Sequence, residues 1–345
     1  MIRTVLLPAD IKEQFLAMQS ASLEPLYYRL NPESFLNRVC RKLGWMNTAR
    51  ALDLRFDIPG HPDRLARVEA IWLSDKFTLP DFLLKALLDK MPCLRWVYWQ
   101  RTGTDNLDLD YFSRRNIALS NTGNLVSHSV AEMNLACILS HAKRLPEHHA
   151  MQKSHEWRAV YCDAVTNQTA GIIGTGNIGR ETARLCKALG MKVVAASRNP
   201  ARFLDRTHPF DHVYHLNKDM DKLLNESDYI VIAVPLNETT RNLFGSALFR
   251  SMRGTAALIN TARCEIVNQD ELLQALTSNR IAAAYIDPPF NRQLYFWDRI
   301  YRTKNLYLTH NSSANYRHKP LDALIKFTQG IEQEDKTGDF PDRVI

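Results

Sequence analysis

The chain has 345 residues, of which 45% are hydrophobic and 23% are charged. At roughly 100–200 residues a domain, this length predicts two domains or one unusually large one. The near-average composition excludes collagen-like, coiled-coil and wholly disordered proteins. Lys and Arg number 44 against 37 Asp and Glu, so the net charge is +7. This balance favours anionic partners such as nucleic acid, a phosphorylated cofactor or an acidic substrate, but charge alone does not choose among them.

The sequence lacks the patterns of several other protein classes. No run approaches the ~20 apolar residues of a membrane span, and the polar Asp10 and Lys12 come too early for a secretory signal. The basic residues are scattered, without a zinc-finger, RNP or basic-zipper pattern. The six cysteines form no C-x-x-C pair and no metal-type spacing with His. We therefore expect a cytoplasmic protein with reduced thiols, no metal, and neither membrane nor nucleic acid as a partner.

Segments rich in Val, Ile, Leu and aromatic residues alternate with longer amphipathic stretches along almost the whole chain. This alternation predicts an α/β fold with parallel sheets. In the first third, the sequence predicts a helix over residues 81–90 and strands at residues 4–8, 68–73, 94–99 and 117–120. Four such strands suffice for a small doubly wound sheet. A long helix is expected over residues 127–143, because apolar residues recur there at helical spacing.

The middle of the chain predicts a second sheet. Its six strands are expected at residues 170–173, 192–196, 229–234, 256–259, 282–286 and 306–309, each separated by a helix-length stretch. Six strands are what a complete dinucleotide-binding sheet requires. After His310 the chain becomes more polar, and we expect a short helix over residues 321–329 followed by an irregular tail.

One segment of the second sheet, Gly174-Thr175-Gly176-Asn177-Ile178-Gly179, fits the pattern G-x-G-x-x-G. An apolar strand leads into it, and a helix over residues 180–189 leads out toward Gly190, which suits a C-cap. The glycines allow a tight turn, a close approach of backbone to pyrophosphate, and close packing of helix on strand. A plain strand-to-helix turn would not need all three. We expect the cofactor contacts at Gly174, Gly176, Asn177, Ile178 and Gly179.

The next strand ends in Ser197-Arg198-Asn199, at the place where an NAD-binding protein puts a carboxylate on the adenosine ribose. No acid stands here to hold the 2′-hydroxyl. A small hydroxyl residue beside an arginine suits a 2′-phosphate instead. Ser197 and Arg198 therefore favour NADPH as the cofactor, with NADH as the second choice.

Four further segments carry a pattern shared with one enzyme family. They are the glycine loop at residues 103–108, Asn121-Thr122 with residues 130–132, Val234-Pro235-Leu236 with Thr240, and residues 259–263. From about Arg67 to the C-terminus, the chain resembles the D-isomer-specific 2-hydroxyacid dehydrogenase family, in particular its NADP-type glyoxylate/hydroxypyruvate reductases. The first sixty or so residues carry little of the resemblance.

The resemblance implies a flavodoxin-like substrate lobe (residues 1–122 and 312–345), a Rossmann cofactor lobe (residues 123–311) and a homodimer. Arg263 would grip the substrate, a role that its planar, permanently charged fork suits. His310 would donate the proton, because an ordinary imidazole titrates near neutrality. The substrate carboxylate would meet the loop formed by Arg101, Thr102 and Gly103. Further cofactor contacts are implied at Thr122, Val234, Pro235, Thr240, Thr261, Ala262 and Asp287.

The chain departs from the family at two places. Counting from Arg263, the slot of the glutamate that hydrogen-bonds the catalytic histidine holds Arg292, followed by Gln293 and not by the family's proline. A cation there would disfavour protonation of a neighbouring imidazole. Arg101 stands where the family more often has a small or apolar residue, so it could bind a second acidic group of the substrate; simple solvent exposure is the alternative.

The sequence thus predicts an NADPH-preferring oxidoreductase that interconverts a 2-oxo acid and a D-2-hydroxy acid. The second hypothesis, which the missing glutamate supports, is a cofactor-binding sensor or regulatory protein of the same fold with little activity. An enzyme using the same pair of residues on a different carbonyl or imine is a third.

Overall fold

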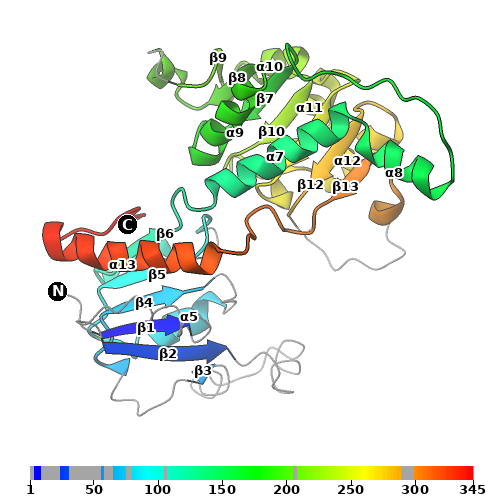
Figure 1. Cartoon of the computed structure of the whole chain (residues 1–345). Coiled ribbons are helices and arrows are strands. Elements are labelled where there is room, and N and C mark those ends of the chain that lie inside the picture. The colour runs from blue at the N-terminus through cyan, green and yellow to red at the C-terminus, as the bar shows by residue number, and fades with distance from the viewer. Residues whose placement is uncertain are drawn as a thin grey trace. The chain divides into compact units, whose positions relative to one another are not determined.

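The computed structural model of the chain describes residues 4–8, 24–30, 56–57, 65–74, 80–104, 107–204, 208–288 and 299–344. It divides into two compact units (Figure 1). Unit 1 comprises Met1–Leu125 and Arg317–Ile345, and unit 2 comprises Val126–Tyr316. Each unit contains a largely parallel sheet with helices packed against it. The predicted α/β fold class is confirmed.

The sheet of unit 1 has the strand order β3-β2-β1-β4-β5-β6, and only the β2–β3 pair is antiparallel. Its strands are β1 (Thr4–Pro8), β2 (Glu24–Leu30), β3 (Phe56–Asp57), β4 (Ala70–Leu73), β5 (Trp96–Trp99) and β6 (Ala118–Asn121). The four predicted strands are present, but β2 and β3 were missed. β2 mixes Glu24, Pro25 and Arg29 with apolar residues, so it lacks the apolar run that marks the other strands.

Helices cover both faces of this sheet. On one face, α5 (Asp81–Leu88) and α6 (Leu109–Arg114) bury apolar side chains against β4 and β5. On the other, α13 (Lys319–Thr337) packs through Phe327, whose ring stacks on Trp96 at a centroid distance of 4.9 Å. The helix predicted over residues 321–329 is present but longer than predicted, and the irregular tail begins only after Thr337. Buried Ile331 and Glu334 continue the packed face, and the helix ends at Gly338, which has a φ of +74°.

The sheet of unit 2 has the order β13-β12-β11-β10-β7-β8-β9, and all its strands are parallel. Its strands are β7 (Thr169–Ile173), β8 (Lys192–Ser197), β9 (His212–His215), β10 (Tyr229–Ile232), β11 (Ala257–Asn260), β12 (Ala283–Ile286) and β13 (Leu306–Leu308). The six predicted strands are confirmed. The edge strand β9 was missed because its polar, half-exposed residues, His212 and His215 among them, carry no apolar run.

Two sets of helices bury the two faces of this sheet (Figure 1). One face packs on α7 (Ser127–Ala142) and α9 (Asn177–Ala188), the other on α10 (Met220–Glu226), α11 (Ser246–Ser251) and α12 (Gln269–Thr277). The remaining elements are α8 (Leu145–Lys153) and the short 3-10 helices η2 (Pro200–Phe203), η3 (Cys264–Ile266) and η4 (Arg299–Arg302). Because strands buried on both faces are apolar throughout, their sequences are easily recognised.

Among the described helices, none combines the length and apolar character needed to cross a membrane. The five described cysteines are free thiols, and Cys40 lies outside the described residues. In the same described part of the chain, no cluster of His, Cys, Asp and Glu side chains could hold a metal ion.

Candidate active site

The glycine motif forms the turn between β7 and α9, at the point where the strand order of the sheet reverses. Gly174 has a φ of +114°, and a Cβ there would lie 2.4 Å from the carbonyl oxygen of Ala233. A Cβ on Gly179 would lie 2.1 Å from the carbonyl oxygen of Gly174. A Cβ on Gly176, in contrast, would meet no described heavy atom within 4 Å. The turn therefore packs tightly on the sheet and leaves open space above Gly176, which fits the approach of a pyrophosphate.

The N-terminus of α9 starts at Asn177, with Gly176 as its N-cap, and its first turn contains no acidic residue. Its free N–H groups and positive dipole end favour an anion. Arg180, which the sequence analysis missed, donates from Nε to the carbonyl of Thr175 over 3.1 Å. Its guanidinium lies 5.7 Å from the ring centroid of Phe203 in η2. In the sequence, the only feature that could have indicated a role for Arg180 is that a basic residue directly follows the glycine motif.

The end of β8 carries the residues predicted to favour NADPH. Ser197 Oγ accepts hydrogen bonds from Thr175 Oγ1 and from the N–H of Asn199, each over 3.3 Å. The side chain of Arg198 is exposed. Ser197 is thus bonded to the glycine turn, and the strand end presents a hydroxyl and a guanidinium rather than a carboxylate.

The loop after β10 contains Val234, Pro235 and Thr240. Thr240 is buried, and its Oγ1 donates to the carbonyl of Pro235 over 2.7 Å and accepts from the N–H of Asn237 over 2.8 Å. Thr240, predicted to contact the cofactor, therefore holds the shape of this loop through its side chain.

Arg263 follows β11 and is fixed through its backbone by Asn260, which is completely buried. Asn260 Nδ2 donates to the carbonyl of Arg263 over 2.9 Å, and its Oδ1 accepts from the N–H of Ala262 over 3.0 Å. Thr261 Oγ1 donates to Asn134 Oδ1 of α7 over 2.9 Å. Neither Asn260 nor Asn134 was among the predicted site residues. Their amides hold the segment that carries the predicted substrate-binding arginine.

The thiol of Cys264, next to Arg263, is not suited to act as a nucleophile. Burial, together with the neighbouring Glu265, raises its pKa to about 12. The thiolate is the reactive form of cysteine, so this side chain stays protonated near neutral pH.

His310 and Asp287 follow the neighbouring strands β13 and β12. His310 and Asn311 have φ values of +56° and +58°, so two consecutive non-glycine residues are left-handed. The His310 ring is exposed and has no hydrogen-bond partner among the described residues. Asp287 is 3% exposed, and its carboxylate accepts hydrogen bonds from residues on both sides of His310, among them Thr309 Oγ1 over 2.5 Å.

Arg263, Asp287 and His310 thus follow β11, β12 and β13, three consecutive strands of one parallel sheet. They share the carboxyl edge with the glycine turn, and ligands of such sheets bind at this edge. Arg292, in the slot of the family's glutamate, lies outside the described residues, so its prediction stays open.

In unit 1, the loop of Arg101, Thr102 and Gly103 directs its carbonyl groups into the protein. The Arg101 oxygen accepts from the N–H of Thr122 over 3.4 Å. The Thr102 oxygen accepts from Asn121 Nδ2 over 3.0 Å, and the Gly103 oxygen accepts from Trp99 Nε1 over 2.9 Å. The N–H groups of Thr102 and Gly103 have no acceptor among the described residues. Such unpaired N–H groups suit a carboxylate.

Two of the predicted site residues in unit 1 have further partners. The Arg101 guanidinium lies 5.3 Å from the ring centroid of Trp99, at cation–π distance. Thr122, predicted to contact the cofactor, is buried in unit 1, where its hydroxyl lies 3.1 Å from that of Thr102.

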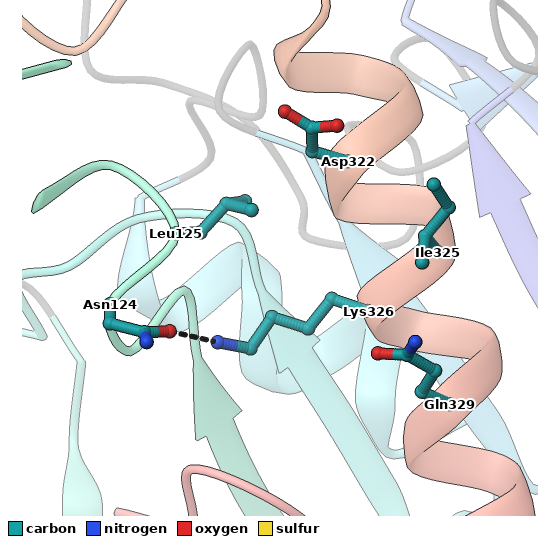
Figure 2. Close-up of a pocket in the computed structure, with 6 residues that line it drawn as sticks. All are labelled: Asn124, Leu125, Asp322, Ile325, Lys326 and Gln329. Atoms are coloured by element: carbon teal, nitrogen blue, oxygen red, sulfur yellow. Dashed lines mark hydrogen bonds between the residues drawn. The ribbon is translucent and has the colours of Figure 1, made fainter. Parts of the chain in front are cut away.

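Lys326 of α13 anchors the chain directly after β6. Its Nζ donates to the carbonyl of Thr122 over 2.8 Å and to Asn124 Oδ1 over 3.3 Å, and it pairs with Asp342 at 2.5 Å. A pocket of about 330 Å³ opens beside these contacts (Figure 2). It is lined by Asn124, Leu125, Asp322, Ile325, Lys326 and Gln329. Since the lysine amine is already engaged, we assign this pocket no ligand.

Comparison with known proteins identifies the class to which this fold and site belong. The family model described as "D-isomer specific 2-hydroxyacid dehydrogenase, NAD binding domain" matches residues 135–312, more than half of the chain. The chain belongs to the D-isomer-specific 2-hydroxyacid dehydrogenase family, as its motifs predicted. It is an NAD(P)-dependent oxidoreductase that acts on the CH–OH group of donors, and it uses a nicotinamide cofactor.

Individual relatives agree with this assignment. A glyoxylate reductase from Thermococcus litoralis is 29% identical over 290 residues, which cover 79% of this chain and 86% of the relative. The solved structure of a D-isomer-specific 2-hydroxyacid dehydrogenase family protein from Aeromonas salmonicida covers 100% of this chain and 99% of its own, with a TM-score of 0.74 and 25% identity.

A third relative shares the fold. The NADPH-dependent glyoxylate/hydroxypyruvate reductase from Sinorhizobium meliloti, solved with NADP and malonate, covers 100% of this chain and 97% of its own. Its TM-score is 0.72 at 19% identity.

Proposed function

We propose that this protein is an NADPH-preferring reductase that converts a 2-oxo acid into a D-2-hydroxy acid, with Arg263 binding the substrate and His310 donating the proton. The observation that carries the proposal is the placement of Arg263 and His310 after β11 and β13, on the carboxyl edge that also bears the glycine turn. Relatives named as glyoxylate and glyoxylate/hydroxypyruvate reductases support the substrate class.

The cofactor would lie along the glycine turn, with its pyrophosphate over Gly176 and the N-terminus of α9. When bound, it supplies the hydride. Ser197 and Arg198 would hold the 2′-phosphate, and the neighbouring Arg180 adds a cation beside the turn. The structural relative solved with NADP supports this preference. NADH is the second choice, and tighter binding of NADH than of NADPH would contradict the proposal.

The substrate would be held by charge and by backbone donors. The Arg263 guanidinium can hold two oxygens at once and stabilise charge that develops on the carbonyl oxygen. The free N–H groups of Thr102 and Gly103 would bind the carboxylate, and Arg101 would bind a second acidic group where the substrate has one. His310 would protonate the carbonyl oxygen as the hydride arrives, and it would accept that proton in the reverse direction.

Arg292 distinguishes this chain from the family pattern. A cation in the glutamate slot would lower the proton affinity of a neighbouring imidazole. We therefore expect slow reduction or a low pH optimum, unless Arg292 points away and a substrate carboxylate or another acid takes the place of the glutamate. Restoring the acid with Arg292→Glu should raise the reduction rate near neutral pH, and unchanged kinetics would refute the idea.

The proposal assigns substrate binding to residues 1–122 and 312–345, cofactor binding to residues 123–311, and a homodimer to the whole protein. Trp157 and Tyr161 support the homodimer, since their side chains are 101% and 93% exposed. Aromatic residues such as Trp and Tyr are enriched in interfaces between protein chains. The cytoplasmic location stays a prediction.

The test measures NADPH consumption with glyoxylate, hydroxypyruvate, pyruvate and bulkier 2-oxo acids. Arg263→Lys should lower kcat/KM about 100-fold or more, because an ammonium cannot hold two oxygens in the same plane. The control is Arg253→Lys, whose arginine pairs with Asp228 at 2.7 Å in the same unit. If NADPH protects the protein thermally but no acid is turned over, the binding-protein hypothesis is favoured. Membership of an enzyme family argues against that hypothesis.

A further inference from the structure

The loop after β5 has its carbonyl groups bonded to the rest of unit 1. The carbonyls of Arg101 and Thr102 accept from residues at the end of β6, and that of Gly103 accepts from the Trp99 indole. In a trans peptide, the C=O of one residue and the N–H of the next point in opposite directions. The N–H groups of Thr102, Gly103 and Thr104 therefore point away from these donors, and none has an acceptor among the described residues. Adjacent N–H groups of this kind suit one carboxylate.

Of the donors to these carbonyls, the Trp99 indole imposes the firmest constraint. Its hydrogen bond to the Gly103 carbonyl is 2.9 Å long, and the Trp99 side chain is 5% exposed. By contrast, the bond from Asn121 Nδ2 to the Thr102 carbonyl is exposed to solvent. A hydrogen bond shielded from water is stronger than an exposed one. The orientation of the Gly103–Thr104 peptide therefore depends mainly on Trp99.

The Trp99 side chain is held in place by the core of unit 1. It belongs to the apolar cluster that α5 and α6 form with β4 and β5, together with Leu73 and Phe112. The chain turns directly after it, where the N–H of Arg101 donates to the carbonyl of Trp99 over 2.8 Å. Since a packed core side chain keeps one rotamer, the position of the Trp99 Nε1 is fixed before any ligand arrives.

The indole ring also contacts the cation of the same loop. The Arg101 guanidinium lies 5.3 Å from the centroid of the Trp99 ring. Among aromatic side chains, tryptophan attracts a cation most strongly. Trp99 therefore acts on two parts of one short segment. Its N–H orients the peptide after Gly103, and its ring holds the guanidinium of a residue just before that peptide.

We propose that Trp99 is a positioning residue for substrate recognition. Its indole N–H orients the Gly103–Thr104 peptide, so that the N–H groups of the loop receive one carboxylate, and its ring holds Arg101 for a second one. The substrate class that fits is a 2-oxo acid with a second carboxylate, because backbone N–H groups and a guanidinium both bind carboxylate oxygens. This proposal rests on the proposed function for the reaction itself and narrows its substrate class.

The first test compares two phenylalanine variants in β5. Trp99→Phe removes the donor to Gly103 and keeps an aromatic ring. KM for 2-oxo acids should rise about tenfold. The value of kcat should stay within about threefold, because the lost contact serves the bound substrate and the transition state alike. The NADPH Kd should not change.

Trp96→Phe is the matched control for this test. Trp96 lies on the same strand, and its Nε1 donates to Ser120 Oγ over 3.1 Å, so the variant loses a bond of the same kind away from the loop. Its KM should remain that of the wild type. Equal KM values in Trp99→Phe and Trp96→Phe would overturn the proposal.

The role of the ring is tested with two substrates of equal length. The acid 2-oxoglutarate carries a terminal carboxylate that 2-oxovalerate lacks, so the wild type should favour it about tenfold or more in kcat/KM. Trp99→Phe should keep most of this preference, whereas Trp99→Leu and Arg101→Met should each abolish most of it. A wild type without the preference, or a preference that survives Trp99→Leu, would overturn the assignment. If Trp99→Leu does not fold, Trp99→Phe and Arg101→Met still decide the question.

Malonate binding provides a readout that does not depend on turnover, because malonate carries two carboxylates and no 2-oxo group. Its Kd, measured by calorimetry on the NADPH complex, should rise about tenfold in Trp99→Phe and stay unchanged in Trp96→Phe. If the wild-type protein reduces no 2-oxo acid but malonate binding depends on Trp99 in this way, the proposed function fails and the positioning role stands. Equal malonate Kd values in the wild type and Trp99→Phe would overturn the positioning role whatever the activity.

Discussion

Two turns at the carboxyl edge of the unit 2 sheet contain residues with positive φ. The two turns accommodate this backbone conformation in opposite ways. The first turn uses Gly174, whose φ is +114° and which carries no side chain. The second uses His310 and Asn311, which keep their side chains and are held by the buried carboxylate of Asp287. Left-handed conformations cost most residues roughly 1–2 kcal/mol, less for Asn and His. In the second turn, the two residues are of these types, and their neighbours are hydrogen-bonded to Asp287.

The difference follows from what each turn has to present. A turn that presents its backbone to a phosphate benefits from having no side chains, so glycine solves the conformational problem locally. A turn that presents an imidazole cannot replace it with glycine. It uses His and Asn, which adopt positive φ elsewhere in this chain as well, and the residues that flank them donate to Asp287. This comparison predicts different consequences for mutations in the two turns.

The largest loss of stability is expected at Gly174, where the glycine turn has no space for a side chain. In Gly174→Ala, the new methyl group would lie 2.4 Å from the carbonyl oxygen of Ala233 at a φ of +114°. Strain and overpacking should together lower the free energy of unfolding by about 2–5 kcal/mol, measured by urea unfolding. The matched variant Gly176→Ala points its methyl group into open space, so it should keep the stability and weaken NADPH binding about tenfold or more. Equal stability of the two variants would contradict this account.

The second prediction concerns Asn260, which holds the Arg263 segment as Asp287 holds the His310 turn. Asn260→Ala leaves the carbonyl of Arg263 and the N–H of Ala262 without their partner in a buried place. We expect a loss of about 1–3 kcal/mol in unfolding free energy and a fall in kcat/KM. Asn260→Asp keeps an acceptor for Ala262 and should fall between the wild type and Asn260→Ala. A stable, active Asn260→Ala variant would show that this edge does not depend on buried side chains.

The third prediction extends the comparison to unit 1, where Lys326 anchors the segment after β6. Lys326→Met removes the donor to the carbonyl of Thr122 and leaves Asp342 without this cation. The side chain of Lys326 is 15% exposed, so the loss should be about 1–2 kcal/mol in unfolding free energy. Lys336→Met, on an exposed position of the same helix, is the control and should change little. If Lys326→Met and the wild type unfold with the same free energy, the Lys326 amine is not needed for stability.

The smallest effect is expected for Asn311→Gly. Glycine adopts a φ of +58° without strain, but it also gains freedom in the unfolded chain, so stability should change by less than about 1 kcal/mol. The informative measurement combines this change with Asp287→Asn. In the double variant, the glycine should recover part of the stability lost in Asp287→Asn, measured by urea unfolding. No recovery would indicate that Asp287 does not act on the backbone conformation of the turn.

The sequence by itself determined the fold class, the glycine turn and the family. These features depend on local patterns: buried parallel strands form apolar runs, and a phosphate-binding turn needs glycines at fixed spacing. The same reliance on local pattern explains what was missed. β2 and β9 mix polar and apolar residues, and α13 continues to Thr337 because Phe327, Ile331 and Glu334 are buried against a distant sheet.

Only the tertiary structure decided what supports the predicted site residues. The sequence singled out Asp287 as a cofactor contact, but it could not show that its carboxylate also accepts from four donors of residues 309–313. It likewise could not show that Asn260 holds Arg263 or that Lys326 holds Thr122. A hydrogen bond between residues far apart in the chain leaves no local pattern, because it depends on how strands and helices are brought together by packing.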